Sequence, residues 1–276
     1  MGRKKFYMAA LLSFVMVLAG CGPEWEYDKI DDVNDLQGRR VGVNLSWEAD
    51  YYLTGRKDME LVRYDTTADM IMALSCNKID AFAVDDMLWK ATEKVGDGVE
   101  KVEPSFGRVG YIMVFGKNDQ ALTEDFNEYL AEFKKTPEYQ KYLERIDGFD
   151  GMDYDTIEIP LTGEGKEIHV AVAADGYPHV FFNPGDNVPC GCDVEPLEYF
   201  ANDRGYKLIF TLTGYDDAIM GLKQGKYDIF TGYIGDVYND EIRAEGLYVS
   251  DNMYEVDMYF VHKNKEKIKV EVDLLE

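Results

Sequence analysis

The cysteines and histidines are the side chains whose chemistry is most easily tested by spacing. Cys190 and Cys192 stand two residues apart, and a cysteine pair completed by histidines can bind zinc. The histidines of this chain lie far from any Cys-x-x-Cys spacing, so we expect no metal site and no cofactor. The same two cysteines are too close for an easy mutual disulfide. Cys76 and Cys192 are expected to pack as small apolar side chains. The histidines are His169, His179 and His262.

A second group of candidate ligands is the run of acids in the Gly- and Asp-rich stretch over residues 147–166. Carboxylates at this density could hold Ca²⁺, but the spacing of an EF-hand loop is not met. Phe149 and Gly151 stand at ligand positions, and Met152 stands where that loop needs glycine. The sequence therefore predicts a solvated connector here rather than a calcium site.

Asp85 comes directly after a predicted buried strand over residues 79–84. In open α/β sheets, ligands lie outside the carboxyl ends of the strands, so this carboxylate is a candidate binding group. Asp85 could instead cap the helix that begins near Met87.

Two further segments place polar groups at the ends of predicted elements. Thr231, Gly232 and Tyr233 end or follow a strand over 227–231, and they could offer a hydroxyl and backbone N–H groups. Ser46 is expected to cap a helix over 46–53, with Trp47 beside it.

The elements that position these groups occur twice in the chain. One copy is Ile71-Met72-Ala73-Leu74 followed by Lys78-Ile79-Asp80-Ala81-Phe82. The other, 148 residues later, is Ile219-Met220-Gly221-Leu222 followed by Lys226-Tyr227-Asp228-Ile229-Phe230. Each copy predicts the end of an amphipathic helix, a short turn and a buried strand. So long an offset indicates two related lobes rather than a solenoid, whose periods are about 20–50 residues. Two such lobes imply a cleft between them.

Around both copies, predicted strands and helices alternate. The first half is expected to have strands over 41–43, 61–64, 79–84 and 111–115, with helices over 67–74 and 87–95. The second half is expected to have strands over 168–173, 207–212, 227–231 and 258–262, with helices over 194–202 and 216–222. This alternation favours an α/β fold with parallel sheets covered by helices.

A pair of helices over 119–146 separates the halves. Thr123 is expected to open the first helix, and Thr136-Pro137 has the pattern of an N-cap and first helical residue for the second. The expected inward residues are Phe126, Leu130 and Phe133 on the first helix, and Tyr139, Tyr142, Leu143 and Ile146 on the second.

The N-terminus has the pattern of an export signal. Three basic residues precede an apolar stretch, Phe6 to Leu18, that is too short for a membrane span. The sequence Leu18-Ala19-Gly20-Cys21 looks like a bacterial lipobox, so we expect residues 1–20 to be removed and Cys21 to carry lipid, including palmitate. Residues 21–34 would then form a tether. The alternative is an ordinary secretory signal followed by an accidental cysteine.

The charge balance excludes one class of partner. The chain has 29 basic and 53 acidic residues, a formal net charge of −24, which becomes −27 without residues 1–20. Phosphates would be repelled at every approach, so no nucleic-acid partner is expected. An acidic surface also serves solubility, and it does not by itself identify a ligand.

The second half resembles the bacterial extracellular solute-binding proteins of family 3, the amino-acid type. Val170-Ala-Val172 through Tyr177-Pro178-His179-Val180-Phe181 is similar to the family's first strand and the aromatic-proline-phenylalanine loop after it. Gly191-Cys192-Asp193-Val194-Glu195 is similar to its Gly-Phe-Asp-Val-Asp helix entry. Gly225-Lys226-Tyr227-Asp228 matches its Gly-Lys-Phe-Asp, and residues 243–251 are similar to its Arg-Ala-x-x-x-x-Phe-Ser-x stretch.

The first half resembles the second lobe of the same family, through residues 35–43 and 80–85, and 119–146 resembles its closing helices. The resemblance implies a two-lobed type 2 periplasmic-binding (Venus-flytrap) fold with the lobe order reversed. The implied domains are a lobe over 35–115, closing helices over 116–146, a connector over 147–166, and the family's first lobe over 167–276.

This order has the form of a circular permutation joined at the connector. Lys29-Ile30 precedes Asp35-Leu36 with the same spacing as Lys267-Ile268 precedes Asp273-Leu274. These segments are interpreted as two remnants of one crossing segment that lie near each other at the hinge, and chance similarity is the alternative. Only the strand near 111–117 is then expected to carry the chain from one lobe to the other.

The resemblance also assigns binding residues. Asp85 matches an acid that pairs with a ligand α-amino group, and Arg243 matches an arginine that grips an α-carboxylate. Because Arg243 lies about three residues further along than in the family, a surface position is the alternative. Tyr177 matches an aromatic that packs on the ligand, with core packing as its alternative. Ser46 and Trp47 replace a Gly-Thr-Thr motif, which permits a larger, cationic or aromatic ligand.

The expected function is capture of a small solute, an amino acid or a related amine or carboxylate, by a monomeric, non-enzymatic lipoprotein on a bacterial membrane, in the periplasm or at the cell surface. An ABC-type transporter permease is the expected partner. The alternatives are a sensor module of the same fold and a dehydratase-like enzyme. Against the enzyme, no catalytic triad or carboxylate pair is placed by a motif.

Overall fold

The computed structural model describes residues 30–95, 98–173, 176–183 and 188–264. The expected signal, Cys21, the tether as far as residue 29 and the Lys267–Leu274 echo therefore lie outside the described residues. In the described part of the chain, no helix combines the length and apolar character that a membrane span requires.

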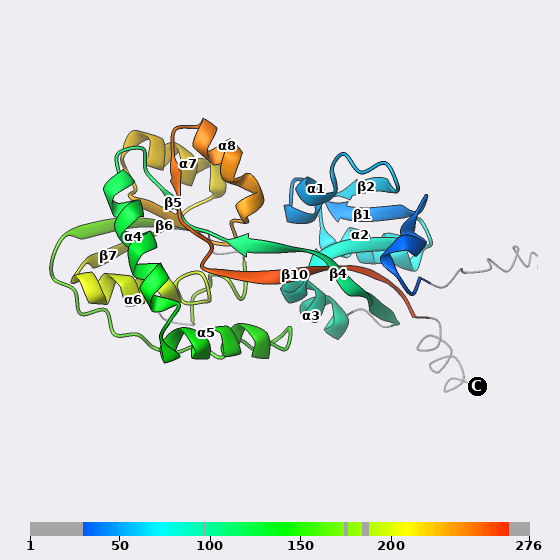
Figure 1. The fold of residues 1–276 in the computed structure, drawn as a ribbon, viewed down its shortest axis with the longest axis horizontal. Helices are drawn as coiled ribbons and strands as arrows, with labels where there is room; N and C mark the ends of the chain where they lie inside the picture. Colours follow the sequence, from blue (N-terminus) through cyan, green and yellow to red (C-terminus); the bar gives the residue numbers. More distant parts are fainter. Residues whose placement is uncertain (1–29, 96–97, 174–175, 184–187, 265–276) are drawn as a thin grey trace, which may run out of the picture. The chain divides into compact units, whose positions relative to one another are not determined.

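From Asp31 onward, the described chain forms one unit by its contacts, and it is built on two five-stranded sheets (Figure 1). The first has the order β2-β1-β3-β10-β4 and, with α1 to α3, is called lobe A. The second has the order β7-β6-β8-β5-β9 and, with α4 to α8, is called lobe B. The two-lobed α/β fold class expected from the sequence is confirmed.

The elements of lobe A are β1 (Arg40–Asn44), α1 (Glu48–Leu53), β2 (Glu60–Tyr64), α2 (Thr67–Ser75), β3 (Ala81–Asp85), α3 (Asp86–Val95), β4 (Val99–Tyr111) and β10 (Tyr254–Lys263). Those of lobe B are β5 (Val114–Phe115), α4 (Gln120–Phe133), α5 (Pro137–Gly148), β6 (Glu167–Val172), α6 (Glu195–Arg204), β7 (Lys207–Leu212), α7 (Tyr215–Gln224), β8 (Ile229–Thr231), α8 (Asn239–Ala244) and β9 (Tyr248–Val249). Two 3-10 turns, η1 (Val33–Leu36) and η2 (Asp236–Tyr238), complete the list.

The sequence repeat corresponds to equivalent positions in the two sheets. The first copy forms α2 and β3, the second forms α7 and β8, and β3 and β8 each take the third place in their strand order. The turns agree as well, because Asn77 and Gly225 both have positive φ, +54° and +73°, at the end of the preceding helix. The repeat therefore does mark two related lobes.

Within the described residues, the chain crosses between the sheets twice. β4 leads through Ile112 and Met113 into β5 of the other sheet, and β9 leads through residues 250–253 into β10. β10 pairs antiparallel with both β3 and β4. Figure 1 shows it beside β4.

Two expected boundaries differ from this arrangement. Residues 254–263 lie in the sheet of lobe A although the sequence placed them in the other lobe, and Val114 and Phe115 lie in the sheet of lobe B. The expectation of a single crossing near 111–117 is wrong. An apolar pattern predicts a strand but does not identify the strand with which it pairs.

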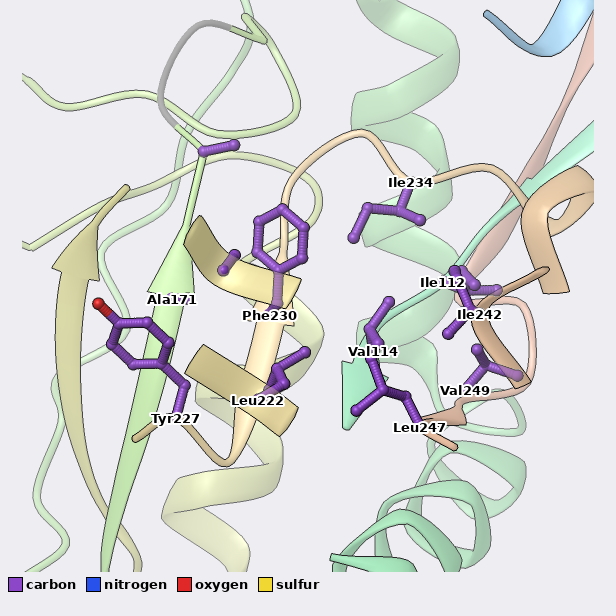
Figure 2. Close-up of a cluster of buried hydrophobic side chains, with 12 residues drawn as sticks. Ile112, Val114, Ala171, Leu222, Tyr227, Phe230, Ile234, Ile242, Leu247 and Val249 are labelled. Carbon is purple, nitrogen blue, oxygen red and sulfur yellow. The ribbon is translucent and has the colours of Figure 1, made fainter. Parts of the chain in front are cut away.

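The core of lobe B depends on the first crossing. Figure 2 shows Ile112 and Val114, which come from the crossing chain, among buried side chains of α7, β8, α8 and β9. The cluster consists of Ile112, Val114, Ala171, Ala173, Ala218, Leu222, Tyr227, Phe230, Ile234, Ile242, Leu247 and Val249. Neither lobe's chain segment therefore completes its core alone.

The helix pair α4 and α5 has the expected inward faces. The predicted apolar residues are buried, apart from Leu143, which is half-buried. Thr136 accepts a hydrogen bond from the Tyr139 N–H at 3.2 Å and so caps α5 as predicted. The first helix begins earlier than Thr123, after Asp119.

The connector after α5 is less solvated than expected. It has no helix or strand over 152–166, but Phe149 and Tyr154 are buried. The Tyr154 N–H donates to the Tyr177 hydroxyl at 2.6 Å. The connector is therefore anchored on lobe B through its aromatic residues.

Candidate functional site

A cavity of about 560 Å³ lies between the carboxyl ends of strands from both sheets. This volume is within the range of small-molecule sites, roughly 300–1,000 Å³. Seven aromatic side chains and three acids contribute to its wall: Trp47, Tyr51, Tyr111, Tyr177, Tyr215, Tyr233 and Tyr238, with Glu48, Asp85 and Glu241. The remaining described lining residues are Ser46, Met87, Leu88, Gly176, Pro178, His179 and Ile234.

Acidic side chains outnumber basic ones in this wall, where His179 is the one basic residue among the described lining residues. Among the described lining residues there is no Lys or Arg, whereas three are acids. Burial and the nearby Asp85 carboxylate together raise the pKa of Glu48 to about 7, while His179 opposes this rise. Two close acids in a partly desolvated cavity favour a cation, because a positive ligand relieves their mutual repulsion.

Aromatic side chains from both lobes meet at the rim of the cavity. The rings of Tyr51 and Tyr238 lie edge to face, with centroids 4.8 Å apart. The Tyr51 hydroxyl donates to Glu241 Oε2 at 3.1 Å, and the Tyr238 hydroxyl donates to the Ser46 carbonyl at 2.7 Å. These two hydrogen bonds join α1 and its preceding turn to lobe B at the cavity.

Asp85 lies in the cavity wall, and it is also a helix cap. Its Oδ1 accepts the Leu88 N–H at 2.7 Å at the start of α3, and its Oδ2 accepts the Tyr111 hydroxyl at 2.9 Å. Asp85 therefore caps α3 and also borders the cavity.

Ser46 and Trp47 also line the cavity. The N-cap of α1 is Trp47, which makes no side-chain cap bond, so Ser46 is not the cap that the sequence predicted. Ser46 has φ +60°, and its N–H donates to Asp50 Oδ2 at 3.0 Å. Asp50, in the first turn of α1, thus holds the turn before the helix by accepting the Ser46 N–H.

The residues expected from lobe B divide into two groups. Tyr177 and Tyr233 line the cavity and are 45% and 37% exposed, so both rings can meet a ligand. Thr231 is fully buried, and its hydroxyl donates to the Asp193 carbonyl at 3.1 Å, so it does not contribute to the described wall. The Tyr233 N–H, expected to be free, donates to Asp193 Oδ2 at 2.6 Å.

Arg243 does not line the cavity. It lies exposed in the last turn of α8, whereas Glu241 of the same helix reaches the wall. Arg243 therefore has the surface position that the sequence analysis gave as the alternative.

Sequence reasoning missed several wall residues, namely Tyr51, Tyr111, Tyr215, Tyr238, Glu241 and His179. Tyr111 lies at the end of the predicted strand over 111–115, and Tyr215 precedes the predicted helix over 216–222, so strand ends and helix starts gave a usable signal. Tyr238 lies in η2 and Glu241 in α8, and no sequence motif predicted either of these short elements.

A compact polar cluster lies buried behind the cavity wall. The side chains of His179, Cys192 and Asp193 bring their nitrogen, sulfur and oxygen atoms within 4.8 Å of one another, and all three residues are buried. Cys192 was expected to pack as a small apolar side chain, but its sulfur lies beside polar atoms of His179 and Asp193. The search for closely spaced cysteines and histidines did not find this cluster, because only the fold of the loop brings His179 and Cys192 together.

Comparison with known proteins gives one match at the level of sequence families. Residues 168–272 match the sequence model of the bacterial extracellular solute-binding proteins, family 3. This segment begins in β6 and includes β10, so it covers most of lobe B and one strand of lobe A. No curated protein matches the chain.

Solved structures show a distant likeness. A ligand-binding component of an ABC-type import system from Staphylococcus aureus, solved with zinc bound, is 11% identical, covers 87% of this chain and 70% of its own, and has a TM-score of 0.41. The GluR0 ligand-binding core in complex with L-glutamate is 13% identical, with coverages of 86% and 91% and a TM-score of 0.38. Holo ArgBP from T. maritima is 17% identical, with coverages of 88% and 90% and a TM-score of 0.37.

Proposed function

We propose that this chain is a receptor that binds a small cationic solute, an amine or ammonium compound, in the cavity between its lobes. The observation that carries the proposal is the composition of the wall. It joins seven aromatic side chains to three acids, without a Lys or Arg among its described residues.

Each class of wall residue favours a cation. An ammonium group within about 6 Å of an aromatic face gains about 0.5–2 kcal/mol, and the gain is larger where water is excluded. Glu48, Asp85 and Glu241 add charge complementarity. A ligand α-carboxylate would meet these acids without a guanidinium partner, since Arg243 is exposed elsewhere. An amine is therefore favoured over the corresponding amino acid.

The mode of action we propose is closure of the two lobes on the solute. A ligand shifts such an equilibrium only through contacts that differ between the two states. The cross-lobe hydrogen bonds of Tyr51 and Tyr238 border the cavity and are candidates for contacts that ligand binding strengthens. The family match over 168–272 supports binding without chemical conversion.

The cellular setting is part of the proposal. Cys21 would carry lipid after removal of residues 1–20, which would place the receptor on a bacterial membrane in the cell envelope. An ABC-type transporter is the proposed recipient of the solute, and a sensor protein is the alternative. Labelling of cells with a fatty-acid analogue tests the anchor, because Cys21→Ala should abolish incorporation and release the protein.

We also infer that the lobe order is reversed relative to the family. In support, β5, α4 and α5 come before β6, the strand with which the family match opens. A chain in which residues 167–264 are joined ahead of residues 31–148 would test this inference. The rearranged chain should fold and bind the same solute. If it is insoluble while the chain in its natural order is soluble, that result would count against a permutation.

The function is tested by thermal shift with matched ligand pairs: agmatine against arginine, cadaverine against lysine, and putrescine against ornithine. Each pair differs by one carboxylate. A ligand at a hundred times its Kd stabilises the folded state by about 2.7 kcal/mol. The amine of at least one pair should raise Tm more than its amino acid.

Site variants then identify where the ligand binds. Glu241→Gln should weaken amine binding, whereas Glu144→Gln, an exposed change on α5, should leave it unchanged. A larger shift with every amino acid than with its amine would reject the cationic specificity. Binding that is insensitive to Glu241→Gln and Glu48→Gln would reject the cavity as the site.

A further inference from the structure

The buried cluster behind the cavity wall has the geometry of a ligand set. His179 Nδ1 lies 3.3 Å from Asp193 Oδ1 and 3.9 Å from Cys192 Sγ, and Cys192 Sγ lies 3.8 Å from Asp193 Oδ1. A point equidistant from these three atoms is about 2.1 Å from each. Zinc bonds are about 2.0–2.1 Å to nitrogen, 2.0–2.2 Å to oxygen and 2.3 Å to sulfur.

Tyr254 provides a fourth atom from a different part of the fold. Its hydroxyl oxygen lies 2.7 Å from His179 Nδ1, 2.5 Å from Asp193 Oδ1 and 3.3 Å from Cys192 Sγ. These distances place it on one side of the plane of the other three atoms, about 2 Å from the same central point. Three donors of N, S and O type then lie around that point, and the Tyr254 oxygen lies over it on one face as a fourth donor.

The geometry points to a site in which His179, Cys192, Asp193 and Tyr254 bind a divalent transition-metal ion of the zinc class. Thiolate and imidazole select such ions over Ca²⁺ and Mg²⁺, which prefer oxygen ligands alone. A thiolate and a carboxylate also supply two negative charges, which balance a divalent cation in a place where uncompensated charge is costly.

A nucleophilic relay does not account for the same arrangement. In such a relay, the nucleophile and the orienting carboxylate contact opposite ring nitrogens of the histidine. Here the sulfur, the carboxylate oxygen and the phenol oxygen all converge on Nδ1. Hydrogen bonds from the Tyr254 hydroxyl to Asp193 Oδ1 and from the Cys192 thiol to the Pro178 carbonyl satisfy part of this set, whereas an ion at the central point would contact all four side chains.

The surroundings hold the proposed ligands in place. The second oxygen of Asp193 accepts the Tyr233 N–H at 2.6 Å, and the Cys192 carbonyl accepts the Tyr142 hydroxyl at 2.9 Å. Hydrogen bonds of this kind orient metal ligands. Cys192 and Asp193 are fully buried, while His179 also borders the cavity, which offers a route of entry.

Two of the ligands are departures from the family motifs. Cys192 stands where the Gly-Phe-Asp-Val-Asp motif has phenylalanine, and His179 follows Tyr177-Pro178 where the other motif has phenylalanine. The ion would join a loop of lobe B to Tyr254, which begins β10 after the crossing into lobe A. Metal binding would therefore fix lobe B to one of the two crossing strands.

The test is titration of metal-free protein with Co²⁺, which reports thiolate ligation as a charge-transfer band in the near ultraviolet. We expect one Co²⁺ per chain with this band, displaced by Zn²⁺. Cys192→Ser should abolish the band and weaken Co²⁺ binding by more than about 100-fold, because loss of an outer-sphere partner alone costs about 10- to 100-fold. His179→Phe should weaken binding similarly.

Matched controls separate this site from other ligands. Cys76→Ser and Cys190→Ser should keep the band, since neither sulfur belongs to the cluster. Glu48→Gln and Glu241→Gln should also keep it, so failure of solute binding and failure of metal binding remain distinguishable.

X-ray absorption of the wild-type zinc complex does not depend on any variant folding. It should show one sulfur at about 2.3 Å and three lighter ligands at about 2.0 Å. A coordination sphere without sulfur, a charge-transfer band that persists in folded Cys192→Ser protein, or the lack of stoichiometric binding would overturn the proposal.

Discussion

Asp80 and Asp228, 148 residues apart, make the same pair of backbone hydrogen bonds in the two lobes. Asp80 Oδ2 accepts the Arg40 N–H at 2.9 Å, and its own N–H donates to the Arg40 carbonyl at 2.8 Å. Asp228 Oδ2 accepts the His169 N–H at 2.7 Å, and its N–H donates to the His169 carbonyl at 2.8 Å. Each aspartate thus joins the turn before β3 or β8 to the neighbouring strand, β1 or β6.

This equivalence leads to a stability prediction. Asp228→Ala removes the acceptor of the His169 N–H and should lower the free energy of unfolding by about 1–2 kcal/mol. Asp228→Asn keeps an acceptor oxygen at the same place and should cost clearly less. Asp80→Ala should cost at least as much, because the Arg40 guanidinium also pairs with Asp80. Urea unfolding of the three variants measures this, and equal losses for Asp228→Ala and Asp228→Asn would contradict it.

The repeat illustrates what the sequence could predict. Helix, turn and strand are local in sequence, so the patterns around Asp80 and Asp228 predicted α2–β3 and α7–β8 with boundaries near those observed. Thr136-Pro137 predicted the start of α5 for the same reason, since the cap hydrogen bond spans only three residues.

The parts that could not be predicted depend on partners distant in sequence. β10 lies between β3 and β4, although its residues carry no signal of that register. β4 extends over Val99–Tyr111 with Pro104 and Gly107 inside it, and both residue types weaken a strand prediction. The cluster of His179, Cys192 and Tyr254 exists only once the crossing strand is placed beside the loop.

The raised pKa of Glu48 leads to a prediction of how amine binding depends on pH. Its pKa, raised to about 7 by burial, leaves the carboxyl largely protonated below that value. A cationic ligand favours the ionised form, so affinity should rise with pH up to about 7 and level off above it, changing up to about tenfold per pH unit below. Isothermal titration between pH 5.5 and 8.5 with an amine whose own charge is constant measures the profile.

The matched variant for this profile is Glu48→Gln. It should bind the amine more weakly at pH 8 and lose the pH dependence between pH 5.5 and 7. A variant that keeps the full wild-type profile would show that another group controls it.

The raised pKa of Glu198 leads to a separate prediction of how stability depends on pH. Burial, together with a smaller effect of the neighbouring Glu195 carboxylate, raises its pKa to about 8. An acid whose pKa is higher in the folded state binds a proton that the unfolded chain has released. Its contribution to stability is therefore lost as the pH rises from about 4.5 to about 8.

Replacement of Glu198 by glutamine should remove this loss. Glu198→Gln should raise the free energy of unfolding at pH 8.5 by about 1–3 kcal/mol relative to wild type, and should have little effect at pH 5. Thermal unfolding at the two pH values measures the difference, with the exposed Glu144→Gln as control. A Glu198→Gln variant destabilised equally at both pH values would rule out the proposed ionisation.

Asp85 allows its two roles to be separated, because they depend on different properties of the carboxylate. Capping of α3 needs an acceptor for the Leu88 N–H, whereas attraction of a cation needs charge. Asp85→Asn keeps an acceptor and loses the charge, so it should change stability by less than about 0.5 kcal/mol while weakening amine binding about tenfold. Asp85→Ala loses both properties and should also lower the free energy of unfolding by about 1–2 kcal/mol.

Tyr111→Phe is the control, because it removes the hydroxyl that donates to Asp85 Oδ2 and leaves the charge, so amine binding should persist. The three variants are compared by urea unfolding and by titration with the amine that gives the largest thermal shift. If Asp85→Asn binds the amine as tightly as wild type, Asp85 serves the helix alone and the cationic site depends on Glu48 and Glu241.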